Sequence, residues 1–183
     1  MKFHATPIPG LVVVETEPRA DPRGRLVRVF GASEFAPLGR EWRFVQVNLS
    51  RTIGRGSVRG LHFQRPPHAE AKLIRCVRGC VFDVAVDCRT GSPTFLRWHG
   101  VELSEDNERE YLLPEGFAHG FQSLTDEAEL LYQHTAEYAP AHEGGLRHDD
   151  PRVGIAWPLP AANLSARDLA LPFSGDGFQG VAT

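Results

Sequence analysis

The sequence lacks any long run of apolar residues. No run approaches the roughly 20 residues that a membrane-spanning helix requires. Residues 1–7 also lack the apolar core of a secretion signal. We therefore expect no association with a membrane, and cytoplasmic residence is the default expectation.

An excess of one charge sign is missing too. Twenty Lys and Arg residues stand against 23 Asp and Glu residues, which gives a formal net charge of −3. A chain with this balance has no overall basic field to attract nucleic acid. We expect no nucleic-acid partner.

Cysteine is scarce. The three cysteines are Cys76, Cys80 and Cys88, an odd number with a spacing unlike that of a zinc knuckle. Cys80 and Cys88 fall on one face of a predicted strand, among aliphatic and aromatic residues. This pattern favours buried packing over a redox or nucleophilic role.

Glycine and proline are plentiful, and they divide the chain into short apolar runs. The 183 residues include 18 glycines and 14 prolines, and 42% of all residues are hydrophobic. The predicted strands are 12–15, 26–30, 44–50, 58–64, 72–77, 81–88, 95–103, 110–113, 120–124 and 130–135. Many short, closely spaced strands predict an all-β sandwich or barrel rather than a parallel sheet. We expect one domain over 1–183, with short helices at 33–40 and after Ser165 and a loose tail at 174–183.

Three predicted strands carry polar residues on one face. These residues are Gln46, Asn48 and Ser50, then Asp83 and Asp87, then Tyr132 and His134. One face of an antiparallel sheet is commonly exposed to solvent. Alternatively, the polar faces line the interior of a barrel, and a second sheet or a subunit covers the aliphatic faces. The alternation by itself leaves both interpretations open.

Two stretches concentrate groups capable of chemistry. Residues 59–72 place an arginine, a histidine, a glutamate and a lysine on two predicted strands joined by a Pro-Pro turn. In residues 113–121, Pro114 and Gly116 suit a tight turn that opens into a strand carrying His119. Together the stretches match the two half-motifs of the cupin fold, a double-stranded jelly roll.

Metal-binding cupins use a His-x-His pair, a glutamate and a later histidine. Here Gln64 stands at the second position of the pair, although His62, Glu70 and His119 would still suit iron or zinc. A metal-dependent cupin oxygenase is therefore one alternative function. A non-catalytic sugar-binding cupin is another.

A larger set of motifs is more specific. It comprises Arg59-Gly-Leu-His62-Phe-Gln64, Asp83-Val-Ala-Val-Asp87, Gly91-Ser-Pro-Thr94, Pro114-Glu-Gly-Phe-Ala-His119-Gly-Phe121, Tyr132, Asp149-Asp-Pro151, Gly154-Ile-Ala-Trp157-Pro158 and Leu164-Ser-Ala-Arg-Asp168. In this order the motifs resemble the dTDP-4-dehydrorhamnose 3,5-epimerase family over about residues 10–172. The resemblance implies a cupin-type jelly roll with short peripheral helices, no metal or other cofactor, and a homodimer.

Inverting a carbon beside a ketone requires three groups. A base removes a proton, a cation or donor stabilises the enolate, and an acid returns a proton on the opposite face. Histidine titrates near neutral pH, lysine can neutralise an oxyanion, and tyrosine can act as a neutral acid. His62, Lys72 and Tyr132 supply these three types of side chain.

The resemblance assigns the roles in the same way. It implies His62 as the base with Asp168 as its partner, and Tyr132 as the acid on the far face of the sugar. It also implies that Lys72, paired with Asp83, stabilises the enolate. The implied reaction converts dTDP-4-dehydro-6-deoxy-D-glucose to dTDP-4-dehydro-L-rhamnose by inversion at C3 and C5. A monoepimerase acting at one carbon is a close variant.

The resemblance also implies residues that bind the nucleotide sugar. Arg59 would bind the diphosphate, which suits a bidentate guanidinium, and His119 would line the pocket near the sugar. The remaining candidates for the nucleotide and its phosphates are Gln46, Asn48, Glu143, Arg167, Arg28 and Arg23, the last reaching across a dimer interface.

Two positions depart from the family pattern. Arg28 stands where members usually have glutamate, and Glu70 stands where they usually have glutamine. Single residues also have simpler interpretations: His62 as a hydrogen-bonded strand histidine, and Asp168 as part of a capping box with Ser165. The joint occurrence of these residues in one family pattern favours the site.

Overall fold

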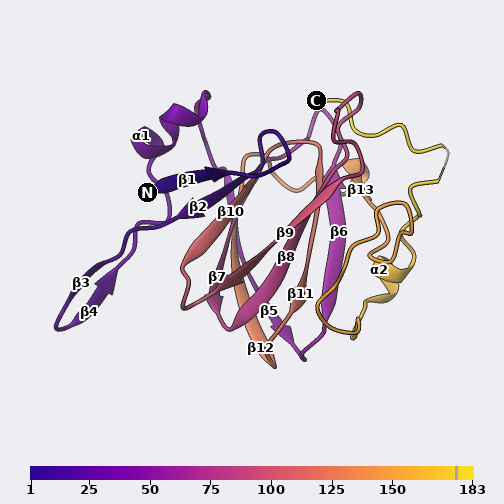
Figure 1. The fold of residues 1–183 in the computed structure, drawn as a ribbon. Helices are drawn as coiled ribbons and strands as arrows, with labels where there is room; N and C mark the ends of the chain where they lie inside the picture. The colour runs from indigo at the N-terminus through magenta and orange to yellow at the C-terminus, as the bar shows by residue number, and fades with distance from the viewer. Residues whose placement is uncertain (176) are drawn as a thin grey trace.

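Two antiparallel sheets face each other and form most of the protein (Figure 1). The computed structural model describes residues 1–175 and 177–183. The six-stranded sheet has the order β1 (Lys2–Ala5), β2 (Val12–Glu15), β10 (Arg109–Leu113), β7 (Lys72–Arg78), β12 (Glu127–His134) and β5 (Gln46–Ile53). The five-stranded sheet has the order β13 (Glu143–Gly145), β6 (Val58–Gln64), β11 (Phe117–Ser123), β8 (Cys80–Asp87) and β9 (Trp98–Ser104). The predicted all-β, cupin-type architecture is confirmed.

A separate hairpin and four short helices complete the described elements. Strands β3 (Arg19–Asp21) and β4 (Gly24–Leu26) form a hairpin that projects from the body of the molecule (Figure 1). The helices are α1 (Ala32–Phe35), η1 (Ala36–Leu38), η2 (Pro140–His142) and α2 (Ala166–Leu169). Among the described residues, no helix has the length and apolar character needed to cross a membrane.

Most predicted strands lie within a few residues of the observed ones, but the prediction for 26–30 is wrong beyond Leu26. The ring of Phe30 packs 5.0 Å from that of Phe35 and 4.8 Å from that of Phe44, measured between centroids. These contacts place Phe30 in an aromatic cluster beside the six-stranded sheet instead of in a ladder of strands. The predictions also missed β1, β3 and β13.

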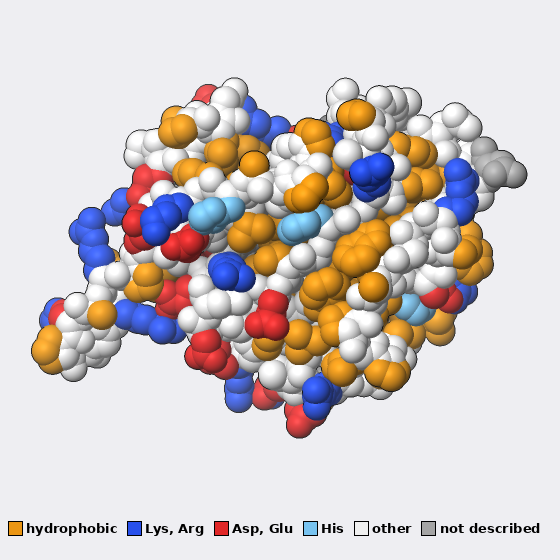
Figure 2. All heavy atoms as spheres, viewed as in Figure 1, with side chains coloured by type: hydrophobic (Ala, Val, Ile, Leu, Met, Phe, Trp, Pro, Cys, Tyr) orange, Lys and Arg blue, Asp and Glu red, His pale blue; other side chains and the backbone are white. Residues whose placement is uncertain are grey.

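The hydrophobic core has three parts, each following the alternation of the strands. Between the sheets, Ile74 and Leu130 of one sheet pack with Ala85 and Phe117 of the other. The outer face of the six-stranded sheet is covered by a cluster that includes Phe35 and Trp42. The C-terminal half of the chain covers the outer face of the five-stranded sheet with Leu146, Val153 and Val181. Apolar side chains are visible between this sheet and the C-terminal segment in Figure 2.

The C-terminal segment 174–183 differs from the loose tail that the sequence predicted. Ser174 and Val181 are buried. The Val181 amide donates to the Cys88 carbonyl at 2.6 Å, and the Thr90 amide donates to the Val181 carbonyl at 2.9 Å. Backbone hydrogen bonds therefore hold the end of the chain beside β8. Residue 176 of this segment lies outside the described residues.

All three cysteines are free, and Cys76 and Cys88 are buried. Burial raises the pKa of Cys76 and of Cys88 to about 12, and that of Cys80 to about 11. Since the thiolate is the reactive form, these thiols are unreactive near neutral pH. The predicted packing role fits this environment.

Glu110 of β10 gives a pH-dependent contribution to stability. Its carboxylate is fully buried and lies 3.5 Å from Arg75; among the described residues, neither oxygen accepts a hydrogen bond. Burial raises its pKa from 4.5 to about 8. Above pH 4.5 the unfolded chain releases a proton that the folded protein keeps, so the free energy of unfolding falls as the pH rises toward 8.

We therefore expect Glu110→Gln to lose less stability than the wild type between pH 5 and pH 8. The difference in slope should be at most about 1.4 kcal/mol per pH unit, the value for one proton. Arginine stays charged throughout this range, so Arg75 does not contribute to the difference. Urea unfolding at several pH values measures it, and equal slopes for the two proteins would contradict the assignment.

Candidate active site

A pocket of about 240 Å³ lies between the two sheets. Its wall includes Asn48 and Tyr132 of the six-stranded sheet and His62 and His119 of the five-stranded sheet. The polar faces of the strands thus point inward, as in the second of the two predicted arrangements. Of the predicted residues, those on the wall are Asn48, Arg59, His62, Lys72, His119, Tyr132, Glu143 and Arg167.

His62 and Asp168 meet although 106 residues separate them. His62 lies on β6, and its Nε2 is 2.7 Å from Oδ1 of Asp168 at the start of α2. The other oxygen of Asp168 accepts the Gly60 amide at 3.4 Å. The predicted cap exists as well, because the Ser165 hydroxyl accepts the Asp168 amide at 3.0 Å. Two hydrogen bonds thus hold the carboxylate, and a third holds the backbone of the same residue.

The charge on Asp168 determines which nitrogen of His62 can act as a base. Burial alone would raise the pKa of Asp168, but the hydrogen bonds from His62 and the Gly60 amide outweigh burial and lower it. An ionised carboxylate only accepts hydrogen bonds, so Nε2 of His62 carries the proton. Nδ1 is then left with a free lone pair.

The predicted pairing of Lys72 with Asp83 is wrong. Both oxygens of Asp83 lie 2.9–3.0 Å from Nε2 of His119, on the neighbouring strand β11. Burial of this pair raises the pKa of Asp83 and lowers that of His119. The prediction failed because β7 and β8, although consecutive in the chain, belong to different sheets.

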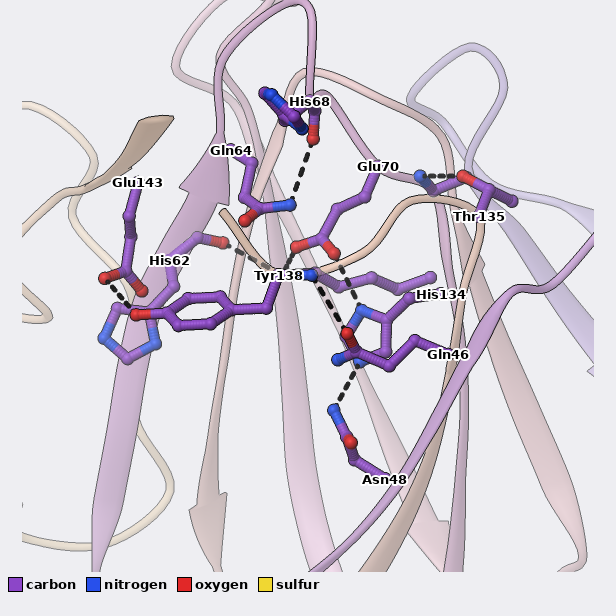
Figure 3. A network of polar contacts seen from close by, with 12 residues as sticks. Gln46, Asn48, His62, Gln64, His68, Glu70, His134, Thr135, Tyr138 and Glu143 are labelled. Atoms are coloured by element: carbon purple, nitrogen blue, oxygen red, sulfur yellow. Dashed lines mark hydrogen bonds and ion pairs between the residues drawn. The ribbon is translucent and has the colours of Figure 1, made fainter. Parts of the chain in front are cut away.

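Lys72 instead contacts Glu70, the residue for which the sequence suggested no role in the proposed chemistry. Its ammonium lies 3.2 Å from Oε1 of Glu70 and donates to the His62 carbonyl at 3.3 Å. The second oxygen of Glu70 lies 2.8 Å from Nδ1 of His134 (Figure 3). His134 was not predicted as a site residue. Its position on the face of Tyr132 was a signal, but its partner comes from a segment 64 residues away.

Tyr132 lies on β12, between the imidazole rings of His119 and His134. Its ring lies edge-on to His119, with 5.8 Å between centroids, and stacks on His134 at 6.0 Å. Burial, with the negative charge of Asp83 adding to it, raises the pKa of Tyr132 well above its ordinary value. The phenol therefore keeps its proton and can act as a neutral acid.

The side of the pocket near Glu143 is formed by a chain of polar contacts. The Tyr138 hydroxyl donates to Oε2 of Glu143 at 3.2 Å (Figure 3), and Oε1 of Glu143 pairs with Arg167. The Tyr138 amide donates to Gln46 at 2.9 Å. Gln46 therefore holds Tyr138, which lines the pocket, and does not line it itself. No sequence pattern pointed to Tyr138, which follows β12 in an irregular segment.

A second cavity of about 430 Å³ adjoins the first. Arg59, His62 and Arg167 line both cavities. Two guanidinium groups at this junction suit anionic groups such as phosphates.

Two predicted substrate-binding residues lie outside the pocket of their own chain. Arg23 is at the tip of the projecting hairpin, with 89% of its side chain exposed, and pairs with Asp21 at 2.6 Å. Arg28 pairs with Glu34 at 3.2 Å and lines a different cavity. Arg28 therefore does not line the pocket between the sheets of its own chain, and its predicted role in substrate binding stays a prediction.

The metal-ligand set of the oxygenase alternative is not assembled. Glu70 is occupied by Lys72 and His134, and within residues 1–175 and 177–183 no three His, Cys, Asp or Glu side chains could hold a metal ion. Gln64 stands where metal-binding cupins have a histidine, and its side chain forms hydrogen bonds with backbone groups. Its amide donates to two carbonyls, those of His68 and Glu137, and accepts from the Ala139 amide.

Comparison with known proteins places this pocket in a family. A family model described as dTDP-4-dehydrorhamnose 3,5-epimerase matches residues 5–175. The protein named dTDP-4-dehydrorhamnose 3,5-epimerase in Methanothermobacter thermautotrophicus is 46% identical over 158 residues, 86% of this chain and 84% of that protein. A Streptomyces niveus protein named dTDP-4-dehydrorhamnose 3-epimerase is 43% identical and covers 92% of this chain and 81% of its own length.

The fold is likewise similar to a solved structure with a ligand. The crystal structure of a dTDP-6-deoxy-D-glucose-3,5-epimerase from Legionella pneumophila in complex with dTDP-4-keto-L-rhamnose matches with a TM-score of 0.89 and 41% identity. The match covers 94% of this chain and 92% of the other. Similarity therefore extends over both sheets and the pocket between them.

Proposed function

The chain belongs to the dTDP-4-dehydrorhamnose 3,5-epimerase family of isomerases acting on nucleotide sugars, and we propose that it converts dTDP-4-dehydro-6-deoxy-D-glucose to dTDP-4-dehydro-L-rhamnose. The observation that carries this proposal is the convergence of His62, Lys72 and Tyr132 on one pocket. The three groups are a base, a cation and a neutral acid, as inversion beside a ketone requires.

The reaction begins with removal of a proton from the carbon beside the C4 ketone. Nδ1 of His62 takes this proton, and the electron pair of the C–H bond moves to the ketone oxygen to form an enolate. Asp168 stabilises the imidazolium that results. The ammonium of Lys72 neutralises the negative charge on the enolate oxygen.

The second half of the reaction returns a proton from the other side of the sugar. Tyr132 gives its phenolic proton to the carbon, and the ketone re-forms. The phenolate then recovers a proton from water, and the imidazolium releases one to water, so the net change is an isomerisation. Inversion at C3 and at C5 requires this cycle twice.

Arg59 and Arg167 bind the diphosphate of the substrate in this proposal. Their place at the junction of two cavities supports it, because the nucleotide can extend into the second cavity while the sugar reaches His62. Asn48, Glu143 and His119 complete the binding surface. Asp83 holds His119, and Gln46 contributes through its contact with Tyr138.

A 3-epimerase that inverts one carbon is the second candidate, favoured by similarity to the Streptomyces niveus protein. Nuclear magnetic resonance of the product separates the two functions. We expect inversion at both C3 and C5 after incubation with dTDP-4-dehydro-6-deoxy-D-glucose. Inversion at C3 alone would support the second candidate, and an unchanged sugar would contradict both.

We also propose a homodimer in which the partner covers the outer face of β5. Val47, Leu49 and Ile53 on this edge strand are 59%, 63% and 70% exposed, and exposed apolar rows of this kind mark interaction surfaces. The projecting hairpin would carry Arg23 toward the partner's pocket. Free cysteines fit a reducing compartment, so cytoplasmic residence remains part of the proposal.

Leu49→Asp should convert the dimer to a monomer, because it places a charge in the apolar contact. Sedimentation velocity measures the change. The control is Leu169→Asp, which alters an exposed leucine on α2 and should leave the dimer intact. A monomeric wild type, or a dimer that survives the Leu49 substitution, would contradict this interface.

A further inference from the structure

We propose that Glu70 and His134 are positioning residues that hold the Lys72 ammonium at the site of the developing enolate. This inference rests on the proposed function, in which Lys72 stabilises the enolate. Glu70 lies in the loop just before Lys72, the first residue of β7, and His134 lies on the distant strand β12. Position 70 is also one of the two positions that depart from the family pattern.

The first argument is the division of the Glu70 carboxylate between two partners. One oxygen lies 3.2 Å from Lys72 Nζ, and the other lies 2.8 Å from Nδ1 of His134. A carboxylate fixed by an imidazole at one oxygen presents the other in a defined direction. Figure 3 shows Glu70 pointing at His134, with Asn48 beyond the imidazole ring.

The burial of these three side chains strengthens the dependence of Lys72 on Glu70. Only 9% of the Glu70 side chain, 9% of Lys72 and 11% of His134 are exposed. A buried ammonium that loses its counter-charge is strongly destabilised, so its position follows the carboxylate. Burial alone would raise the pKa of Glu70, but the His134 hydrogen bond and the charge of Lys72 outweigh burial and lower it. The carboxylate is therefore ionised at neutral pH.

The hydrogen-bonding capacity of the ammonium supports the same role. Lys72 has three N–H donors. Glu70 and the His62 carbonyl account for two of them, which leaves one for the substrate oxygen. Because the His62 carbonyl belongs to the strand that carries the base, these contacts fix the ammonium relative to that base.

His134 extends the arrangement to the proposed acid. Its ring stacks on Tyr132 with an interplanar angle of 16°, and its Nε2 lies 3.4 Å from the Asn48 amide nitrogen. The imidazole is thus held between an amide, an aromatic ring and Glu70. The charge of Lys72 also acts on Asp83 and His119, which pair with each other, and His62 and Tyr132 line the same pocket.

The test compares Glu70→Gln with Glu129→Gln, which removes a carboxylate on β12 that faces Arg78 rather than the pocket. We expect Glu70→Gln to lower kcat about 10- to 100-fold, because small displacements of a reacting group have effects of this size. KM should change by less than about threefold, since the interaction acts in the transition state. Glu129→Gln should match the wild type.

The pH profile separates positioning from a general structural defect. A buried ammonium without its counter-charge gives up its proton more readily, so the alkaline limb of kcat should move to lower pH in Glu70→Gln. In a Lys72→Met background, Glu70→Gln should cost nothing further, because its effect passes through Lys72. His134→Phe keeps the ring beside Tyr132 and removes the hydrogen bond to Glu70; it should lower kcat in the same sense.

An unchanged kcat and alkaline limb in Glu70→Gln would overturn the inference, and so would an equal loss in the Lys72→Met background. If Glu70→Gln does not fold, as judged by circular dichroism, His134→Phe decides, and wild-type kcat in that variant contradicts the proposal. Failure of the proposed function would be seen in a different result from failure of this inference. In that case the wild-type protein itself leaves the nucleotide sugar unchanged.

Discussion

His62→Asn is expected to lower kcat for epimerisation by about 10²- to 10⁴-fold, the usual contribution of a general base. Asparagine replaces the imidazole, whose Nε2 lies 2.7 Å from Asp168, with an amide that cannot take a proton from carbon. Exchange of substrate hydrogens with solvent should fall in parallel with turnover. Steady-state kinetics and exchange into deuterated water measure the two effects.

A second histidine supplies the control for this substitution. His68 packs against the ring of His142 at 4.5 Å and does not line the pocket. His68→Asn should therefore retain wild-type turnover. Wild-type activity in His62→Asn, or an equal loss in both variants, would remove His62 from the role of base.

Tyr132→Phe is expected to separate proton removal from inversion. The ring still fills the space beside His119 and His134, but the phenolic proton is missing. His62 can still remove a proton and return deuterium to the same face of the sugar. We expect exchange with retained configuration, while product formation falls about 10²- to 10⁴-fold.

Two outcomes would contradict this role of Tyr132. One is formation of inverted product at the wild-type rate, which would require another acid. The other is loss of exchange together with inversion in a folded variant, which would make Tyr132 necessary for proton removal. Mass spectrometry of substrate and product distinguishes these outcomes.

Local sequence pattern was sufficient for much of the fold, and the family pattern assigned the main catalytic candidates. Alternation identified β6 and β12 and placed His62 and Tyr132 on their polar faces, because side chains on a strand point to opposite sides in turn. It could not say whether those faces point inward. That depends on packing between the sheets, where Ile74 and Phe117 meet.

Contacts between distant parts of the chain were beyond the reach of local pattern. Lys72 and Asp83 lie close in the chain, so a pairing between neighbouring strands was the natural prediction, yet the strands enter different sheets. Glu70 and His134 meet across 64 residues. The family pattern, rather than spacing, suggested the contact of His62 with Asp168.

The most direct test of the account is incubation of the wild-type protein with dTDP-4-dehydro-6-deoxy-D-glucose in deuterated water, with His62→Asn in parallel. The account predicts a product inverted at C3 and C5 that carries deuterium at both carbons, and almost no exchange in the variant. Inverted product without solvent deuterium, or undiminished exchange in the His62 variant, would contradict it.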